Sequence, residues 1–320
     1  MTPTILRTAT VIGCGLIGTS AALALTRSGV EVALHDRDPA AVAEAELLGA
    51  GTALAAGRPP ADVVVVATPP STVVEVLYEA QARGLGHAYT DVASTKEHIC
   101  AEAELLGCDL RGYVPGHPMA GAELSGPAAA RADLFAGRPW ILCPFGTTPS
   151  TALHAVTDLV SRCAAEPVAL APGEHDRAAA VLSHGPHLVS AALAARLADT
   201  DPALLALSGP GLRDTTRTAG GDPGLWSEIL AQNAGAVAEV AEEVAARLLS
   251  AAAALRSGDA PSVCALLAQG AHGRSALVGA ADAGRWDGPR RRTGPPGTER
   301  RRPGAGAARP AGRGPRTRSG

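Results

Sequence analysis

Aromatic residues are scarce in this chain, since tryptophan, tyrosine and phenylalanine make up only 2% of its 320 residues. Single-stranded nucleic acids commonly stack on aromatic side chains, so this scarcity argues against a nucleic-acid partner. Apolar residues still reach 46% of the sequence, which suffices for packed cores of alanine, valine and leucine. The length leaves room for two domains.

Paired cysteines and long apolar runs are also missing. The six cysteines are scattered without a C-x-x-C pair, and the apolar run at 63–67 (VVVVA) is far too short to cross a bilayer. No signal-peptide pattern opens the sequence. We therefore expect reduced thiols, a cytoplasmic location and no membrane partner.

Lysine is nearly absent, because Lys96 is the single lysine among 28 basic residues. An ammonium and a guanidinium are not interchangeable, so Lys96 is a candidate functional residue, with chance survival as the alternative. Residues 281–320 hold 11 arginines and 3 acidic residues, and residues 285–320 contain no Val, Ile, Leu, Met, Phe or Tyr. This composition predicts a disordered tail. We favour a frame-shifted terminus over a functional basic arm.

Short β-branched runs alternate with Ala- and Leu-rich stretches through the first half of the sequence. This order predicts a doubly wound parallel sheet of the Rossmann type in an α/β fold. Helices are expected at 16–29 and 38–50, the second with Asp38 as its N-cap. The expected strands are 8–13, 30–36, 61–68, 87–92, 111–116, 138–144 and 166–170.

Strand patterns stop near residue 174. Long Ala- and Leu-rich stretches at 174–199, 222–258 and 259–273 predict helices. We therefore divide the chain into three parts. These are a Rossmann domain over 1–172, an all-α helical domain over 173–284 and the tail over 285–320.

A glycine-rich turn follows the first expected strand and opens the first expected helix. Gly13, Gly15 and Gly18 have the G-x-G-x-x-G spacing of loops that bind a pyrophosphate at a helix N-terminus. Asp36 ends the second strand, where a carboxylate accepts from a ribose 2′-hydroxyl; this favours NAD, and Arg37 beside it keeps NADP as the lesser alternative. The predicted cofactor contacts are Gly13, Cys14, Gly15, Leu16, Ile17, Gly18, Asp36 and Thr68.

Polar residues also gather beyond later strands, where doubly wound folds bind their ligands. The stretch DVASTKEH (91–98) offers Ser94 and Lys96, and GHPMAG carries His117. For the first stretch the structural alternative is that Ser94 or Thr95 caps the following helix.

Two further motifs fall in the helical half. SHGPHL places His184 and His187 three residues apart on one helical face, around a Gly-Pro pair that should kink the helix. Core histidines are the alternative, and zinc is disfavoured because no nearby Cys or acid completes a ligand set, so we expect no metal. The stretch 209–220 (GPGLRDTTRTAG) holds Asp214 and Arg217, and an arginine there could grip a carboxylate.

Together these residues indicate a dehydrogenase of a small hydroxy acid. A histidine with a pKa near neutrality takes the hydroxyl proton while a nicotinamide accepts the hydride from the same carbon.

The motifs GCGLIG, DVASTK, GHPMAGAELSG, GEHDR, LSHGPHLV and GPGLRDTTRTA followed by DPGLW occur in this order over roughly residues 9 to 273. In this they resemble the prephenate/arogenate dehydrogenase family, also called TyrA. The resemblance implies a Rossmann domain and a helical domain that dimerises, hence a homodimer. It also implies NAD-dependent oxidative decarboxylation of prephenate to 4-hydroxyphenylpyruvate, or of arogenate to tyrosine, in tyrosine biosynthesis.

The resemblance also implies roles for single residues. His117 would interact with the C4 hydroxyl, Ser94 would lie near nicotinamide and substrate, and Arg217 would bind the ring carboxylate. Further residues implied at the substrate site are His184, His187, Lys96, Glu123 and Asp214, with His175 at a matching motif position of uncertain role. Ala122 departs from the family's frequent threonine. The short polar tail is no ACT domain, so feedback through such a domain should be absent.

Three alternative functions differ in the residues that they require. A dehydrogenase of a 4-amino prephenate analogue would carry the same residues, and no residue decides between prephenate and arogenate. A non-catalytic NAD-sensing protein would keep the glycines without needing His117, Ser94 and Arg217 together. β-Hydroxyacid dehydrogenases rely on a lysine in the helical domain, where this chain has none.

Overall fold

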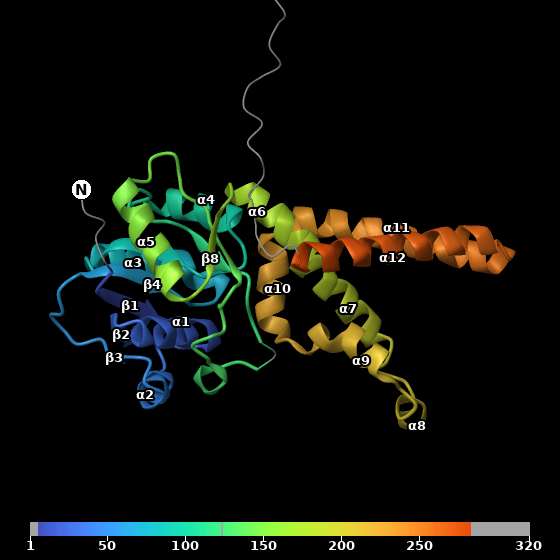
Figure 1. Cartoon of the computed structure of the whole chain (residues 1–320), viewed down its shortest axis with the longest axis horizontal. Helices are drawn as coiled ribbons and strands as arrows, with labels where there is room; N and C mark the ends of the chain where they lie inside the picture. Colours follow the sequence, from blue (N-terminus) through green and yellow to red (C-terminus); the bar gives the residue numbers. More distant parts are fainter. Residues whose placement is uncertain (1–5, 123, 283–320) are drawn as a thin grey trace, which may run out of the picture. The chain divides into compact units, whose positions relative to one another are not determined.

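The computed structural model describes residues 6–122 and 124–282. Its first half contains a five-stranded sheet in the order β3–β2–β1–β4–β5, in which all neighbouring strands run parallel (Figure 1). The strands are β1 (Thr8–Ile12), β2 (Glu31–His35), β3 (Thr52–Ala53), β4 (Ala61–Val66) and β5 (Gly86–Asp91). The helices that connect or follow them are α1 (Leu16–Arg27), α2 (Pro39–Leu47), α3 (Val73–Ala82) and α4 (Glu97–Leu106). This confirms the predicted doubly wound parallel sheet.

Strand β4 shows why its run is apolar throughout. Successive side chains of a strand point to opposite faces of the sheet. Val63 and Val65 pack into a core with α1 and with α5 (Ser150–Arg162), while Val64 and Val66 pack into a second core with α3 and α4. Helices therefore bury both faces, as a parallel sheet requires.

A second, three-stranded sheet follows, made of β6 (Gly116–Pro118), β7 (Pro139–Leu142) and β8 (Glu166–Ala169). β6 runs antiparallel to β7, and β7 runs parallel to β8. The strand predicted at 111–116 does not form over that range, since Tyr113 makes a single bridge with Tyr89 and only Gly116 belongs to a strand, β6. Pro115 explains the interruption, because proline has no N–H to continue the ladder beside β5.

The second half is helical among the described residues. Its elements are α6 (Pro172–Ala179), a π turn (Ala180–His184), α7 (Gly185–Ala195), α8 (Pro202–Leu205), α9 (Pro210–Thr216), the 3₁₀ turn η4 (Arg217–Gly220), α10 (Pro223–Gln232), α11 (Ala234–Ser257) and α12 (Ala260–Asp282). Two short 3₁₀ turns, Pro70–Thr72 and Pro127–Ala129, lie in the first half. α11 and α12 lie side by side (Figure 1). The predicted tail over 285–320 falls outside the described residues.

The helix boundaries show where the sequence patterns succeeded. Asp38 is the N-cap of α2 as predicted and accepts from the N–H of Ala40, and Asp222 caps α10 by accepting from that of Leu225. The kink expected at Gly185–Pro186 takes the form of the π turn just before it. The single helix predicted over 222–258 is two helices, because Asn233 leaves the helical backbone region between α10 and α11.

The run Pro172–Ala195 is, within the described part of the chain, the one helical stretch long and apolar enough to cross a membrane on length and composition alone. Its buried His175, Asp176 and His184 make hydrogen bonds with other elements. Such contacts belong to a helix packed inside a folded protein.

Candidate active site

The glycine loop between β1 and α1 is shaped by close packing at two of its three glycines. A Cβ on Gly13, which has φ of +107°, would lie 2.3 Å from the carbonyl oxygen of Ala67, and a Cβ on Gly18 would lie 1.9 Å from that of Gly13. A Cβ on Gly15 would meet no atom within 4 Å. Open space therefore lies beside Gly15 at the N-terminus of α1, where backbone N–H groups attract an anion.

Asp36 is held against this loop. Its carboxylate accepts from the N–H of Cys14 at 2.6 Å and from that of Asp38 at 2.9 Å. Burial, with Asp36 nearby, raises the pKa of the Cys14 thiol to about 12, so the thiol stays neutral. Leu16 and Ile17 pack partly buried against the core, and Thr68, just beyond β4, has a buried hydroxyl without a hydrogen-bond partner among the described residues.

Lys96 lies fully buried beyond β5, where its ammonium donates to Asp91 at 2.5 Å. The same carboxylate accepts from the hydroxyl of Tyr113 at 2.6 Å and from the backbone N–H groups of Ala93 and Gly116. This network gives a physical reason for the single lysine, because a compact ammonium fits a buried site that a guanidinium would overfill.

The turn between β5 and α4 meets the helical half. Ser94 is half-buried there. Capping of α4 by Ser94 or Thr95 is wrong, since the N–H groups of Lys96 and Glu97 donate to the carboxylate of Asp176 at 2.8 and 2.9 Å. The hydroxyl of Thr95 instead donates to the side chain of Gln232, at the end of α10.

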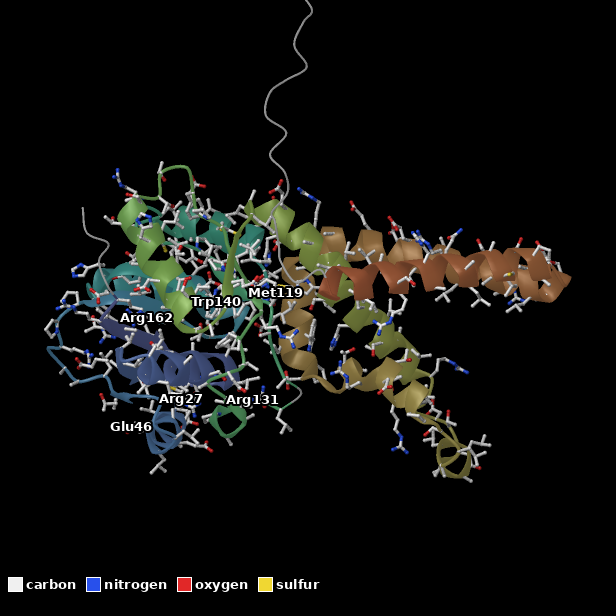
Figure 2. All side chains as sticks on the ribbon, viewed as in Figure 1. Arg27, Glu46, Met119, Arg131, Trp140 and Arg162 are labelled. Atoms are coloured by element: carbon white, nitrogen blue, oxygen red, sulfur yellow. The ribbon has the colours of Figure 1, made fainter. Side chains whose placement is uncertain are left out.

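His117 lies on β6 and is 9% exposed. Two contacts hold its strand against β7. Trp140 pairs with Pro118 in the ladder, and the N–H of Met119 donates to the carbonyl oxygen of Pro139; Trp140 and Met119 are labelled in Figure 2. Burial, and then the nearby His175, Lys96 and His184, hold the pKa of His117 well below 6.5. The ring is therefore neutral near pH 7 and can accept a proton.

His175 connects His117 to Asp176. Nε2 of His175 lies 2.7 Å from Nδ1 of His117, and Nδ1 of His175 lies 2.7 Å from a carboxylate oxygen of Asp176. The structure thus brings His117, His175, Asp176 and Lys96 into one buried cluster, with side chains from β6, α6 and the start of α4.

His184 and His187 lie on the π turn and on α7. Nδ1 of His184 is 3.1 Å from the amide nitrogen of Asn233, while Nε2 of His184 and Nδ1 of His187 are buried without a partner among the described residues. Burial lowers the pKa of His184 to about 4 and lowers that of His187. His187 stacks on Trp226 with ring centroids 3.4 Å apart. Both rings are neutral and retain an unused nitrogen, as groups that await a ligand do.

The remaining predicted residues lie elsewhere. Asp214 on α9 and Arg217 at the start of η4 are exposed, on a segment joined to α7 by the hydrogen bond from the Ser190 hydroxyl to the carbonyl of Thr215. Glu123 is outside the described residues. No group of three or more His, Cys, Asp and Glu side chains within 6–122 and 124–282 has an arrangement suited to a metal.

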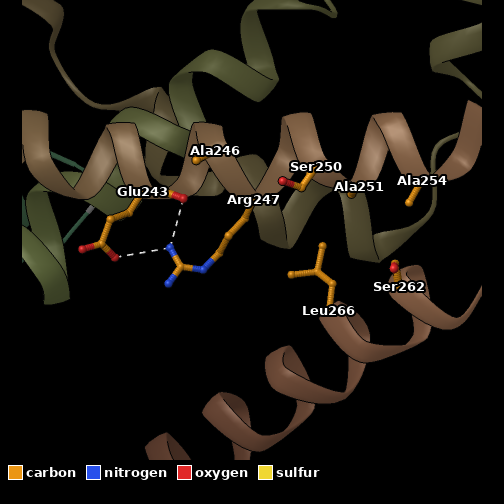
Figure 3. Close-up of a pocket in the computed structure, with 8 residues that line it drawn as sticks. All are labelled: Glu243, Ala246, Arg247, Ser250, Ala251, Ala254, Ser262 and Leu266. Carbon is orange, nitrogen blue, oxygen red and sulfur yellow. Dashed lines mark hydrogen bonds and ion pairs between the residues drawn. The ribbon is translucent and has the colours of Figure 1, made fainter. Parts of the chain in front are cut away.

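A pocket of about 370 Å³ lies between α11 and α12 (Figure 3). Arg247 spans part of it and donates to the carbonyl and carboxylate oxygens of Glu243 at 2.9 and 3.3 Å. None of the predicted site residues lines this pocket. This pocket is therefore not the candidate site.

Known proteins resemble this chain in sequence and in fold. Residues 21–169 match the family described as "Prephenate dehydrogenase, nucleotide-binding domain", and residues 171–269 match "Prephenate dehydrogenase, dimerization domain". The chain is 42% identical over 254 residues to the probable prephenate dehydrogenase NovF of Streptomyces niveus, covering 78% of this chain and 69% of that protein. This chain belongs to the prephenate dehydrogenase family.

Two other relatives agree with that membership. The chain is 32% identical to the prephenate dehydrogenase of Bacillus subtilis over 69% of its own length and 62% of that protein's. The chain thus spans about two thirds of the curated relatives' length. The prephenate dehydrogenase of A. aeolicus, solved in complex with hydroxyphenyl propionate and NAD+, superposes with a TM-score of 0.75 at 26% identity and covers 85% of this chain and 98% of that one.

Some residues that shape the candidate site were not predicted from the sequence. Asp176, Asn233 and Trp226 carry much of the geometry, yet the sequence patterns did not single them out. Asp176 had a signal, since an acid beside a histidine in GEHDR precedes an apolar helix. Trp226 had a weaker one, as one of three tryptophans. Asn233 had none, because the pattern around it continues as a helix.

Proposed function

We propose that this protein catalyses the NAD-dependent oxidative decarboxylation of prephenate or arogenate. The observation that carries the proposal is His117, a buried neutral histidine joined to His175 and Asp176 beyond the carboxyl edge of a nucleotide-binding sheet. A neutral imidazole is the group that an alcohol oxidation needs to accept the hydroxyl proton. Family membership supplies the class of substrate.

The loop residues fit a dinucleotide. Gly13 and Gly18 leave no room for a side chain within the turn, while Gly15 faces open space. Asp36 is oriented by two backbone N–H groups and favours an unphosphorylated ribose, hence NAD over NADP. When bound, NAD supplies the hydride acceptor. Cys14, Leu16, Ile17 and Thr68 complete the proposed contacts.

The proposed roles of the other residues follow from charge and burial. His117 accepts the proton of the C4 hydroxyl, with Ser94 beside it. Arg217 attracts the ring carboxylate, and His184 and His187 offer their unused nitrogens to the substrate. Burial chiefly keeps the imidazole of His117 neutral, and the ammonium of Lys96, paired with Asp91, adds to that effect. Asp214 and Glu123 stay predictions as further substrate-site residues.

The proposed reaction balances without releasing a proton. The C4–H electron pair leaves as hydride, and the hydroxyl proton passes to His117. The electron pair of the bond to the departing CO2 then enters the ring, which becomes aromatic. The oxygen takes the same proton back as a phenol. A base that takes up a proton and later returns it to the same oxygen is best shielded from water. Burial shields His117 in this way.

We also propose a cytoplasmic homodimer with the divisions 1–172, 173–284 and 285–320. Strand β8 ends at Ala169, and the two family matches meet at residues 169–171. Exposed apolar side chains on α11 and α12 suit a second copy: Leu248, Leu249, Leu255, Leu267, Leu277 and Val278. Sedimentation equilibrium should then give about twice the chain mass of 32.0 kDa.

The test follows absorbance at 340 nm with NAD and then NADP, offering prephenate and arogenate separately. Reduction of NAD with either substrate supports the proposal and names the substrate. No reduction with either, from protein that still binds NAD, overturns it and favours the 4-amino analogue or the NAD sensor.

A further inference from the structure

Three side chains form a continuous buried row: His117 on β6, then His175 and Asp176 on α6. Each of its two contacts measures 2.7 Å, from Nδ1 of His117 to Nε2 of His175 and from Nδ1 of His175 to Oδ1 of Asp176. The three residues are 9%, 0% and 3% exposed. Water has little access, so the members of the row determine where its protons lie.

Asp176 fixes the direction of the row. Burial alone would raise its pKa, but the hydrogen bonds from His175 and from the N–H groups of Glu97 and Lys96 outweigh burial and lower the pKa. The side chain is therefore a carboxylate, which only accepts hydrogen bonds. It is also anchored, since both oxygens are engaged by the first turn of α4.

The positions of the protons follow from these acceptors. Because Asp176 only accepts, Nδ1 of His175 carries a proton. When His175 carries this single proton, its Nε2 is an acceptor and Nδ1 of His117 donates to it. His117 is itself neutral, which leaves the lone pair of its Nε2 unused within the row.

We propose that His175 and Asp176 are positioning residues that hold the proton of His117 on Nδ1, so that Nε2 presents its lone pair to the substrate hydroxyl. The inference rests on the proposed function for its substrate. When Nε2 accepts the hydroxyl proton, the resulting imidazolium keeps its Nδ1–H on His175, and Asp176 offsets the positive charge through that ring. A carboxylate fixes a histidine tautomer in the same way in Ser-His-Asp enzymes.

Other charged and titratable groups face this row from neighbouring elements. Lys96 approaches His117 from the start of α4 and is itself paired with Asp91. His184 approaches both His117 and Asp176 from the π turn. Variants of His175 leave all of these side chains in place, so a change in activity reports on the row.

The first test needs no turnover. In protein with 15N-labelled histidine, NMR spectra assign the tautomer of each ring, and the spectrum of His117→Asn identifies the resonances of His117. We expect a proton on Nδ1 and none on Nε2 for both His117 and His175 at pH 7.5. A proton on Nε2 of His117 overturns the proposal, whatever reaction the enzyme catalyses.

The second test compares two small amides at one position. The amide of Gln reaches about as far as ring Nε2, and that of Asn about as far as Nδ1. His175→Gln keeps an acceptor for His117 and should retain kcat within about tenfold, whereas His175→Asn should lose on the order of 10²–10⁴-fold in kcat with little change in KM. Similar losses in both variants, with melting temperatures unchanged, overturn the positioning role.

The two tests separate this inference from the proposed function. If the wild type reduces NAD with neither substrate but shows the expected tautomers, the proposed function fails and the positioning of His117 stands. If the wild type turns over and His117 carries its proton on Nε2, the reverse holds.

Discussion

The two halves of this protein treat their buried polar atoms differently. In the nucleotide-binding half, Asp91 accepts from Lys96, Tyr113 and two backbone N–H groups, and Asp36 accepts from two more. The unpaired buried side-chain atoms of that half, among the described residues, belong to groups that do not ionise near neutral pH, the hydroxyl of Thr68 and Nε1 of Trp140. In the helical half they belong to ionisable groups: Nε2 of His184, Nδ1 of His187 and an oxygen of Glu228. Because an unpaired buried polar atom is costly, such atoms indicate ligand contacts.

The two halves also differ in how far their helices and sheets are covered. The sheet of the first half buries both faces under helices. Helix α12 of the second half is exposed throughout the part whose side chains are described, apart from Val263 and Leu266, which are partly buried. The chain's own helices therefore cover the sheet of the first half, whereas the proposed second copy would cover the exposed helices of the second half.

The largest expected effect lies at the contact between the halves. His117→Asn removes the proton acceptor, and kcat should fall on the order of 10²–10⁴-fold, the usual contribution of general base catalysis. The affinity for NAD, measured by calorimetry, should not change, because the substitution lies outside the glycine loop. His98→Asn is the matched control, since the side chain of His98 is 55% exposed and, among the described residues, paired only with Glu102. Equal activity of His117→Asn and wild type would show that His117 takes no part in the reaction.

The converse effect is expected within the first half. Gly18→Ala places a Cβ 1.9 Å from the carbonyl oxygen of Gly13, so the loop must shift. NAD affinity should fall by about 100-fold or more, which corresponds to ~2.7 kcal/mol. Gly146→Ala is the control, because its Cβ would meet nothing within 4 Å. Unchanged NAD binding by Gly18→Ala would show that the cofactor does not use this loop.

The same contrast explains what the sequence could and could not predict. Gly13, Gly18 and Asp36 were found because their roles depend on a local turn and a fixed spacing. Lys96 was found because it follows a strand, and His117 because it follows the stretch 111–116, which was expected to be one. The row through His175 to Asp176 was not, since it joins His117 to a residue 58 positions away, and no local pattern encodes that contact. The strand expected at 111–116 failed for a local reason, the missing N–H of Pro115.

A smaller effect on stability is expected where α7 packs against α11 in the second half. A Cβ at Gly185 would lie 2.5 Å from Cγ1 of Val240 and 2.7 Å from the carbonyl oxygen of Ala180, so Gly185→Ala should push α7 from α11. The expected loss is about 1–3 kcal/mol in the free energy of unfolding. A Cβ at Gly235 in α11 would meet nothing within 4 Å, so Gly235→Ala should raise the free energy of unfolding by up to ~1 kcal/mol. Denaturant unfolding measures both, and equal stabilities would mean that α7 and α11 do not pack as closely as described.

The smallest expected effect is the pH dependence that His184 contributes. Burial lowers its pKa to about 4 in the folded protein, whereas the unfolded chain keeps a histidine pKa of about 6.5. Between these values the unfolded state binds a proton that the folded state does not. Stability should therefore fall as the pH is lowered, by at most ~1.4 kcal/mol per pH unit for this group.

A variant isolates that contribution. His184→Gln should show a shallower loss of the free energy of unfolding between pH 6.5 and pH 5 than the wild type, with no difference in slope above pH 7. His154→Gln, at an exposed position on α5, should keep the wild-type slope. If His184→Gln and the wild type lose stability in parallel, the buried ring is not held neutral. In that case the unpaired Nε2 of His184 would carry a proton and could donate it to an anionic group. The two halves would then differ in the charge of their buried side chains.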